Sequence, residues 1–128
     1  MSKETIRVVA ADDDPEMLAM VSRQLKKLGV ELRVAANGED ALHLIQDSPP
    51  DLVVLDVMMP GMNGWEVCRK IREDRSLDTT GVIMLTGIGE RLNEMTSPLY
   101  GADEYLDKPF EFEDFEGCVK RVLRKRRA

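Results

Sequence analysis

The sequence has no apolar run long enough to cross a membrane and no apolar segment at its beginning. Spanning a bilayer takes roughly 18 or more consecutive apolar residues, and no stretch of the chain approaches that length. The opening residues, Met1 to Glu4, lack the apolar core of a secretory signal. We therefore expect a soluble, cytoplasmic protein that does not act at a membrane.

Cysteine and histidine are scarce as well. The two cysteines, Cys68 and Cys118, lie far apart, and neither has paired ligand spacing around it. This excludes a zinc site or a disulfide framework as an organising feature, and we expect both thiols to be reduced packing residues. The single histidine, His43, falls in a helical stretch and is expected to be incidental.

What the sequence does contain is typical of one compact domain over residues 1–128. With 43% hydrophobic and 33% charged residues, the composition indicates a buried core under a solvated surface. The net charge of −6 argues against direct binding of nucleic acid. Basic residues nevertheless gather at 119–128, which is interpreted as the solvated end of the last helix, as a docking patch or as the start of a linker towards an output domain.

Short β-branched runs alternate with longer segments of helical period. This alternation is typical of a parallel sheet covered by helices on both faces, so the expected fold class is α/β. The predicted strands are Ile6–Ala11, Glu31–Ala35, Leu52–Asp56, Val82–Thr86 and Glu104–Leu106.

Capping signals predict where the first three helices begin. Pro15 at the first helical position leaves Asp14 as the N-cap, and Gly29 provides a C-terminal stop. Asn37 and Asn63 are predicted N-caps of the second and third helices, because an acidic residue follows three positions after each.

The fourth and fifth helices are expected within Gly89–Tyr100 and Glu111–Arg126. Pro98 falls inside the first of these segments, where it removes one backbone hydrogen bond and crowds the preceding turn. The fourth helix is therefore expected to be kinked, shortened or shifted, which would alter a partner surface.

Polar residues stand at the ends of the predicted strands. In open α/β sheets, ligands bind beyond the carboxyl ends of the strands. These ends carry Asp12, Asp13, Asp56, Thr86 and, just past the fifth strand, Lys108. Three carboxylates, a hydroxyl and an ammonium are therefore expected to converge.

Such a cluster predicts a phosphoryl-transfer site. Two carboxylates about 4 Å apart repel by about 4 kcal/mol at an effective dielectric of about 20, so three of them require positive charge. Hard oxygen ligands suit Mg²⁺, with Mn²⁺ as an alternative, and phosphate oxygens commonly complete the shell. If Asp56 carries a phosphoryl group, the metal and Lys108 can hold its oxygens while Thr86 donates a hydrogen bond.

Four motifs resemble those of the receiver domain of two-component response regulators. VVAADDDP at Val8–Pro15 resembles the family's acidic pair, and DLVVLDVMMPGMNG at Asp51–Gly64 resembles its phosphoacceptor segment. VIMLTG at Val82–Gly87 and GADEYLDKPF at Gly101–Phe110 resemble the switch threonine, the switch aromatic and the lysine-proline turn. The resemblance covers essentially the whole chain and implies a flavodoxin-like, doubly wound sheet in the order 2-1-3-4-5 with five helices.

The resemblance also implies a role for each site residue. Asp56 would be the nucleophile that accepts the phosphoryl group. Asp12 and Asp13, with Asp56 and the backbone carbonyl of Met58, would hold Mg²⁺. Lys108 would form an ion pair with the phosphoryl group.

A second set of residues would carry the switch. Thr86, followed by Gly87 in a loop, would move towards the phosphoryl group, and Tyr105 would turn inward to fill the vacated space. A cis peptide bond before Pro109 would help to place the lysine. The surface around the fourth and fifth helices would change and contact an output domain or target protein, or form a dimer.

The expected function is thus a switch that receives its phosphoryl group from a histidine kinase or a phosphotransfer protein. It would catalyse only its own phosphorylation and dephosphorylation, and would bind neither membrane nor nucleic acid. Met58 and Ile88, each two residues past a key site residue, are apolar and cannot orient an attacking water. We therefore expect a slow loss of phosphate.

Three other classes fit less well. A haloacid-dehalogenase-type phosphatase needs Asp-x-Asp followed by Thr or Val, whereas Asp14 is followed by Pro15, and the length leaves no room for a cap domain. A flavodoxin-like electron carrier needs hydroxyls and free amides where this chain has three aspartates. An interaction module that is never phosphorylated would not need all five site residues.

Overall fold

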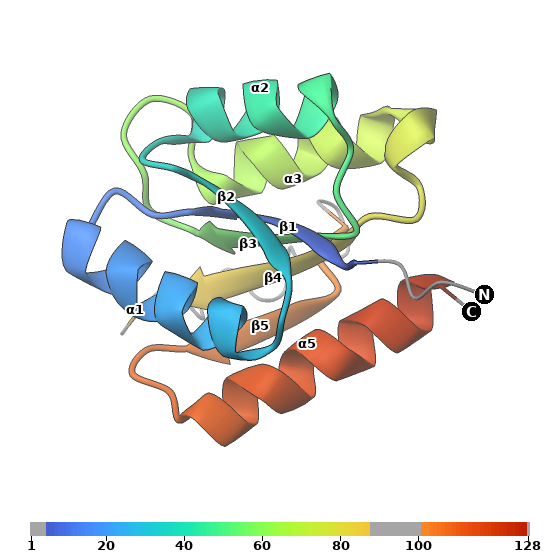
Figure 1. Cartoon of the computed structure of the whole chain (residues 1–128). Helices are drawn as coiled ribbons and strands as arrows, with labels where there is room; N and C mark the ends of the chain where they lie inside the picture. The colour runs from blue at the N-terminus through green and yellow to red at the C-terminus, as the bar shows by residue number, and fades with distance from the viewer. Residues whose placement is uncertain (1–4, 88–100, 128) are drawn as a thin grey trace.

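In the computed structural model, which describes residues 5–87 and 101–127, a five-stranded sheet lies between two layers of helices (Figure 1). The strands are β1 (Arg7–Ala11), β2 (Glu31–Ala35), β3 (Leu52–Asp56), β4 (Gly81–Thr86) and β5 (Glu104–Asp107). Their order is β2-β1-β3-β4-β5, and every neighbouring pair is parallel. The predicted α/β class and strand order are confirmed.

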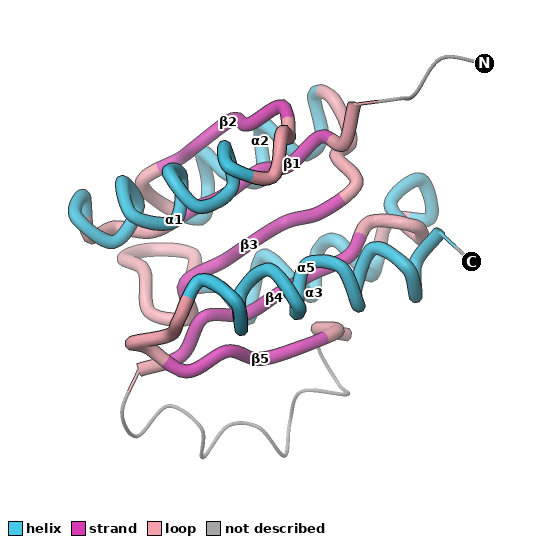
Figure 2. The backbone as a smooth tube through the Cα atoms, turned by 60° about the horizontal axis from the view of Figure 1, so that its bottom comes forward, coloured by secondary structure: helices cyan, strands magenta, loops and turns pink. Residues whose placement is uncertain are grey.

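The described residues contain the α-helices α1 (Pro15–Lys27), α2 (Gly38–Asp47), α3 (Gly64–Glu73) and α5 (Phe112–Arg127), and the 3₁₀ helix η1 (Arg75–Leu77). α2 and α3 cover one face of the sheet, and α1 and α5 cover the other (Figures 1 and 2). Among these helices, none is both long and apolar enough to cross a membrane. The predicted fourth helix at 89–100, with Pro98, lies outside the described residues, as does Ile88.

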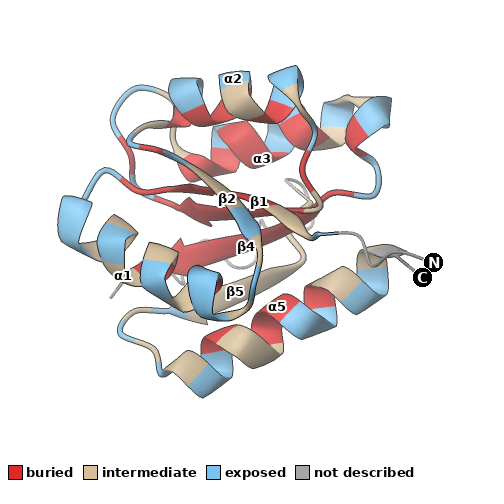
Figure 3. Ribbon diagram, viewed as in Figure 1, coloured by how far each residue is buried: buried red, intermediate tan, exposed pale blue. Residues whose placement is uncertain are grey.

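The side chains of each strand point alternately to the two faces of the sheet, and this divides the core into two apolar clusters. In β1, Val9 and Ala11 belong to the cluster under α2 and α3, while Val8 and Ala10 belong to the cluster under α1 and α5. Successive strand side chains point to opposite faces, so one apolar run serves both helical layers. Figure 3 shows the buried central strands between helices whose outer surfaces are exposed. Each fully buried aliphatic side chain contributes roughly 1.5–3 kcal/mol to folding.

Helices α1, α2 and α3 begin where the capping residues predicted. The Asp14 side chain accepts a hydrogen bond from the second amide of α1 at 3.0 Å. Asn63 accepts from the Glu66 amide at 2.9 Å, and Glu66 accepts from the Asn63 amide at 3.0 Å, which closes a capping box. Asn37 accepts from the Asp40 amide at 2.7 Å. The Asp40 carboxylate accepts a hydrogen bond from the side-chain amide of Asn37 at 3.0 Å.

Ion pairs at the amino ends of β4 and β5 tie α3 and α5 to the sheet. The Asp103 carboxylate, whose side chain is 1% exposed, contacts Arg72 at 3.0 Å, Lys125 at 3.0 Å and Arg126 at 2.8 Å, and accepts from the Val82 amide at 2.9 Å. Burial raises the pKa of Asp103, but the hydrogen bonds from Arg126, the Val82 amide and Lys125 outweigh it and lower the pKa overall. This carboxylate is therefore held in its charged form as a structural tie.

Candidate functional site

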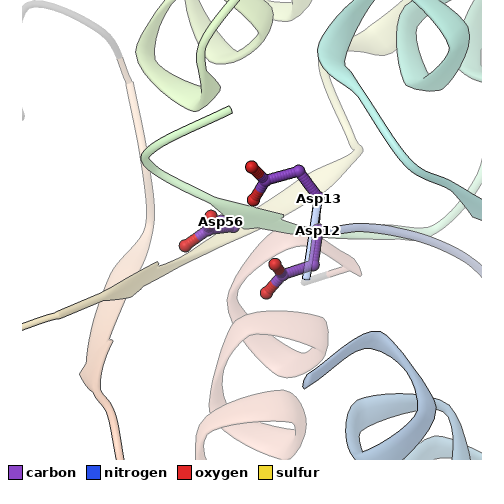
Figure 4. Close-up of side chains that lie close together, drawn as sticks. All are labelled: Asp12, Asp13 and Asp56. Carbon is purple, nitrogen blue, oxygen red and sulfur yellow. The ribbon is translucent and has the colours of Figure 1, made fainter. Parts of the chain in front are cut away.

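Three carboxylates meet at the carboxyl ends of β1 and β3. These strands are adjacent and in register, with Ala11 opposite Leu55, so the residues that follow lie side by side. Oxygen atoms of Asp12, Asp13 and Asp56 all lie within 4.8 Å of one another. Figure 4 shows the three side chains close together at the carboxyl ends of these strands, as the sequence predicted.

The environment of each carboxylate is different. Asp12 and Asp56 are 2% and 4% exposed, whereas Asp13 lies on the surface. The Asp14 amide donates to Oδ1 of Asp12 at 2.9 Å, which orients that carboxylate. Gly64 packs so closely on the end of β3 that a Cβ atom there would lie 2.5 Å from the carbonyl oxygen of Asp56. The start of α3 is thereby fixed against the site.

Lys108 supplies positive charge to this cluster. Its Nζ lies 2.6 Å from Oδ1 of Asp56 and 3.3 Å from Oδ2 of Asp12. Its backbone amide donates to the Thr86 carbonyl at 2.7 Å, and its peptide bond to Pro109 is cis. Burial lowers the pKa of Lys108, but the hydrogen bond and charge of Asp56, with those of Asp12, outweigh it and raise the pKa overall. Lys108 is therefore a fixed cation at neutral pH.

One ammonium does not balance three carboxylates. Like charges about 5 Å apart repel by about 3 kcal/mol at an effective dielectric of about 20. The pKa of Asp12 is raised, chiefly because burial disfavours its charged form, although the Asp14 amide and Lys108 act in the opposite direction. Among the described residues, the site therefore carries more negative than positive charge, and its hard oxygen donors are those that Mg²⁺ prefers.

The remaining predicted residues lie in β4 and β5 and in the loops that follow β3 and β4. The Thr86 hydroxyl is 2.7 Å from Oδ1 of Asp107. The Tyr105 ring packs on Trp65, with ring centroids 5.5 Å apart and planes inclined by 41°. The Met58 side chain is exposed in the loop after β3. Gly87 is half-buried directly after β4.

Sequence reasoning missed two residues of the site. It ended the fifth strand at Leu106, and so left out Asp107, which pairs with Thr86 across β4 and β5. Aligning the ends of these two strands would have revealed the pair. The sequence identifies Gly64 only as the last residue of the segment Asp51–Gly64, and its approach to Asp56 is a tertiary contact for which the local sequence has no signal.

Comparison with known proteins covers nearly the whole chain. The family model of the response regulator receiver domain matches residues 8–120. The probable transcriptional regulators ycf27 of Porphyra purpurea and Galdieria sulphuraria are 35% identical over 125 residues and 36% identical over 119 residues. These alignments cover 98% and 93% of this chain but 50% and 46% of the two proteins. The chain thus spans about half the length of the curated relatives it matches.

Solved structures of receiver domains and response regulators match this chain over more than nine tenths of their own length. A putative response regulator from Chloroflexus aurantiacus has a TM-score of 0.88 and 33% identity, covering 94% of this chain and 98% of its own. The chemotaxis protein CheY4 of Vibrio cholerae has a TM-score of 0.86 and 32% identity, with 93% and 99% coverage. The receiver domain of a signal transduction histidine kinase from Syntrophus aciditrophicus has a TM-score of 0.86 and 28% identity, with 94% and 92% coverage.

Proposed function

Because this chain belongs to the response regulator receiver domain family, matched over residues 8–120, we propose that it is a phosphorylation-operated switch whose phosphoacceptor is Asp56. One observation carries the proposal: a cluster of three carboxylates, two of them buried, in which Lys108 contacts Asp56. A purely structural cluster would be expected to balance its charges. Among the described residues, this cluster instead carries more negative than positive charge, and Lys108 contacts two of its three carboxylates.

The donor set fits a divalent metal. Asp12, Asp13 and Asp56 would hold Mg²⁺, or Mn²⁺, together with the backbone carbonyl of Met58. When bound, the cation would offset the carboxylate charge and the charge of incoming phosphoryl oxygens. Lys108 is already in place to hold one of these oxygens, because its Nζ contacts the proposed phosphoacceptor.

The chemical step that we propose is a direct phosphoryl transfer. An Asp56 carboxylate oxygen forms a bond to the phosphorus of a phosphohistidine on a histidine kinase or phosphotransfer protein. The phosphorus–nitrogen bond breaks, its electron pair returns to the imidazole, and that nitrogen takes up a proton. The product is an acyl phosphate on Asp56, with Lys108 and Thr86 on its oxygens.

The proposed lifetime of this phosphate is long. The exposed Met58 side chain stands two residues after Asp56 and is apolar, so it offers no group to orient a water for hydrolysis. Ile88 is likewise apolar in the sequence. Met58→Asn together with Ile88→Glu is expected to speed dephosphorylation, and an unchanged rate would remove this part of the proposal.

The proposed output is a change in the surface around the fourth and fifth helices. Thr86 would move to the phosphoryl group and Tyr105 would turn inward; its ring already contacts Trp65. The relatives of twice this length are named as probable transcriptional regulators, which supports an output domain or target protein as partner. The same surface could pair two copies of the chain, and we place the protein in the cytoplasm, where kinase and target would meet it.

Intact mass measurement tests the proposal. Incubation with Mg²⁺ and acetyl phosphate is expected to add the mass of one PO₃H group to the wild type and none to Asp56→Asn. Asp47→Asn, an exposed position on α2, is the matched control and should be modified as the wild type is. The adduct should be lost with hydroxylamine, as an acyl phosphate is, and its absence from folded wild type would refute the proposal.

A further inference from the structure

Thr86 and Asp107 share a short side-chain hydrogen bond. The Thr86 hydroxyl lies 2.7 Å from Oδ1 of Asp107 and 3.5 Å from the carbonyl oxygen of Leu106. An ionised carboxylate can only accept, so the hydroxyl is the donor. The shorter distance is typical of a charge-assisted bond, whereas the longer one is at the outer limit of hydrogen bonding. The hydroxyl proton is therefore directed mainly at Asp107.

The two partners differ in their access to water. Thr86 is 0% exposed, whereas Asp107 lies exposed at the end of β5. A buried hydroxyl needs a partner in every state of the protein. An exposed carboxylate that loses one hydrogen bond is rehydrated at little cost. The pair is therefore suited to opening whenever Thr86 finds another acceptor.

The strand register places this pair beside the proposed phosphoacceptor. Thr86 and Asp107 are opposite residues of β4 and β5. The next residue, Lys108, donates from its amide to the Thr86 carbonyl at 2.7 Å and from its Nζ to Asp56 at 2.6 Å. Asp107 thus holds the Thr86 hydroxyl, and the next residue, Lys108, contacts the Asp56 carboxylate. A phosphoryl group on Asp56 would bring that hydroxyl and that carboxylate together.

We propose that Asp107 is a positioning residue that holds the Thr86 hydroxyl until an anion on Asp56 draws it away. The inference rests on the proposed function, in which Thr86 donates to a phosphoryl oxygen. A hydroxyl has one proton, so that donation competes with the bond to Asp107. Asp107 thereby sets how strongly the anion must attract Thr86 before the switch moves.

Affinity for beryllofluoride, a mimic of a carboxylate-bound phosphoryl group, tests the competition. In the presence of Mg²⁺, with Trp65 fluorescence as the readout, Asp107→Ala is expected to bind about tenfold more tightly than wild type, the effect of removing one charge-assisted competitor. Asp107→Asn keeps a neutral acceptor, and its affinity should fall between the two. Equal affinity of Asp107→Ala and wild type would overturn the proposal.

Removing a negative charge near an anion site could tighten binding without any role for Thr86, and a double-mutant cycle separates the two effects. Thr86→Val keeps the shape of the side chain but has no hydroxyl. In that background, Asp107→Ala should change the affinity by less than about twofold, because no competition remains. A tenfold gain that persists in the Thr86→Val protein would assign the effect to general repulsion and overturn the positioning role.

The same measurements distinguish a failure of the proposed phosphoacceptor role of Asp56 from a failure of the positioning role of Asp107. If folded wild type binds no beryllofluoride, the phosphoacceptor role of Asp56 is wrong, and the role of Asp107 falls with it. If wild type binds and the Asp107 variants match it, only the positioning role is overturned. Cooperative thermal unfolding shows that each variant is folded, and Asp107→Ser replaces Asp107→Ala in the same comparison if the alanine variant is not.

Discussion

The two ends of the parallel sheet hold their buried carboxylates in opposite ways. At the amino ends, the single carboxylate of Asp103 contacts three cationic side chains, and its pKa is lowered. At the carboxyl ends, Asp12, Asp13 and Asp56 lie close together, Lys108 is the one cation paired with them among the described residues, and the pKa of Asp12 is raised. The first arrangement stabilises the fold. The second has a deficit of positive charge that folding alone does not relieve.

This contrast separates structural from functional ion pairs without reference to any relative. A carboxylate surrounded by several cations needs nothing further, so its removal should cost stability and leave ligand binding intact. A crowded set of carboxylates with one cation should lose repulsion when one of them is removed, while its ligands bind less well. Four measurements test whether the two ends of the sheet differ in this way.

The greatest loss of stability is expected from a substitution at the amino ends of the strands. Asp103→Ala leaves three cations without their carboxylate, and breaking a buried pair of this kind lowers the free energy of unfolding by about 3 kcal/mol. Urea denaturation measures the change. Asp47→Ala on the exposed face of α2 is the control and should stay within about 0.5 kcal/mol of wild type. A loss no larger than that of the control would show that Asp103 is not a structural tie.

The next effect is ligand stabilisation at the carboxyl ends. Mg²⁺ at a hundred times its dissociation constant should raise the free energy of unfolding of the wild type by about 2.7 kcal/mol. Asp13→Asn removes one proposed ligand, so the same Mg²⁺ concentration should stabilise that variant far less. Thermal unfolding with and without Mg²⁺ gives both values, and equal stabilisation of the two proteins would exclude Asp13 from the metal site.

In the absence of divalent cations, Asp13→Asn should instead raise the free energy of unfolding. Asp13→Asn relieves repulsion from two neighbouring carboxylates, which amounts to about 1 kcal/mol of added stability once solvent screening at this exposed position is allowed for. Urea denaturation in EDTA measures the gain, and added NaCl should reduce it. A destabilised variant would mean that Asp13 has a structural role after all.

A smaller difference is expected between the acid stabilities of the wild type and an Asp103 variant. The pKa of Asp103 is lowered below its ordinary value of 3.8, so this residue contributes stability above pH 3.8 that is lost as the pH falls through its folded-state pKa. Asp103→Asn cannot lose that contribution, and its stability should fall less steeply than that of wild type below pH 3.8. Parallel slopes in denaturation at a series of acidic pH values would contradict the lowered pKa.

Local signals in the sequence were sufficient for the framework. Strands Glu31–Ala35 and Leu52–Asp56 have the predicted bounds, because β-branched runs end there at turns and polar residues. The first helix begins at Pro15 because Asp14 caps it. The convergence of Asp12, Asp13 and Asp56 followed from the rule that ligands bind at the carboxyl ends of parallel strands, and the order that makes β1 and β3 neighbours was implied by the family resemblance.

Contacts that depend on tertiary packing were not predictable in this way. The four partners of Asp103 lie in α3, β4 and α5, which are far apart in the chain, and no local sequence pattern indicates these contacts. The bond between Thr86 and Asp107 depends on the last residue of β5, where predicted strand ends are least certain. The direction of each pKa shift likewise reflects burial, which the sequence does not state.

The division of β1 and β3 between two cores has a consequence for how this chain can tolerate insertions. A single extra residue in the middle of β3 would exchange the faces of every side chain beyond it, so groups that fill one apolar layer would point into the other. The same slip would shift Asp56 by one position relative to Asp12 and dismantle the cluster. Changes of length inside β3 should therefore not be tolerated, because its five residues determine both the packing of the two apolar clusters and the position of Asp56.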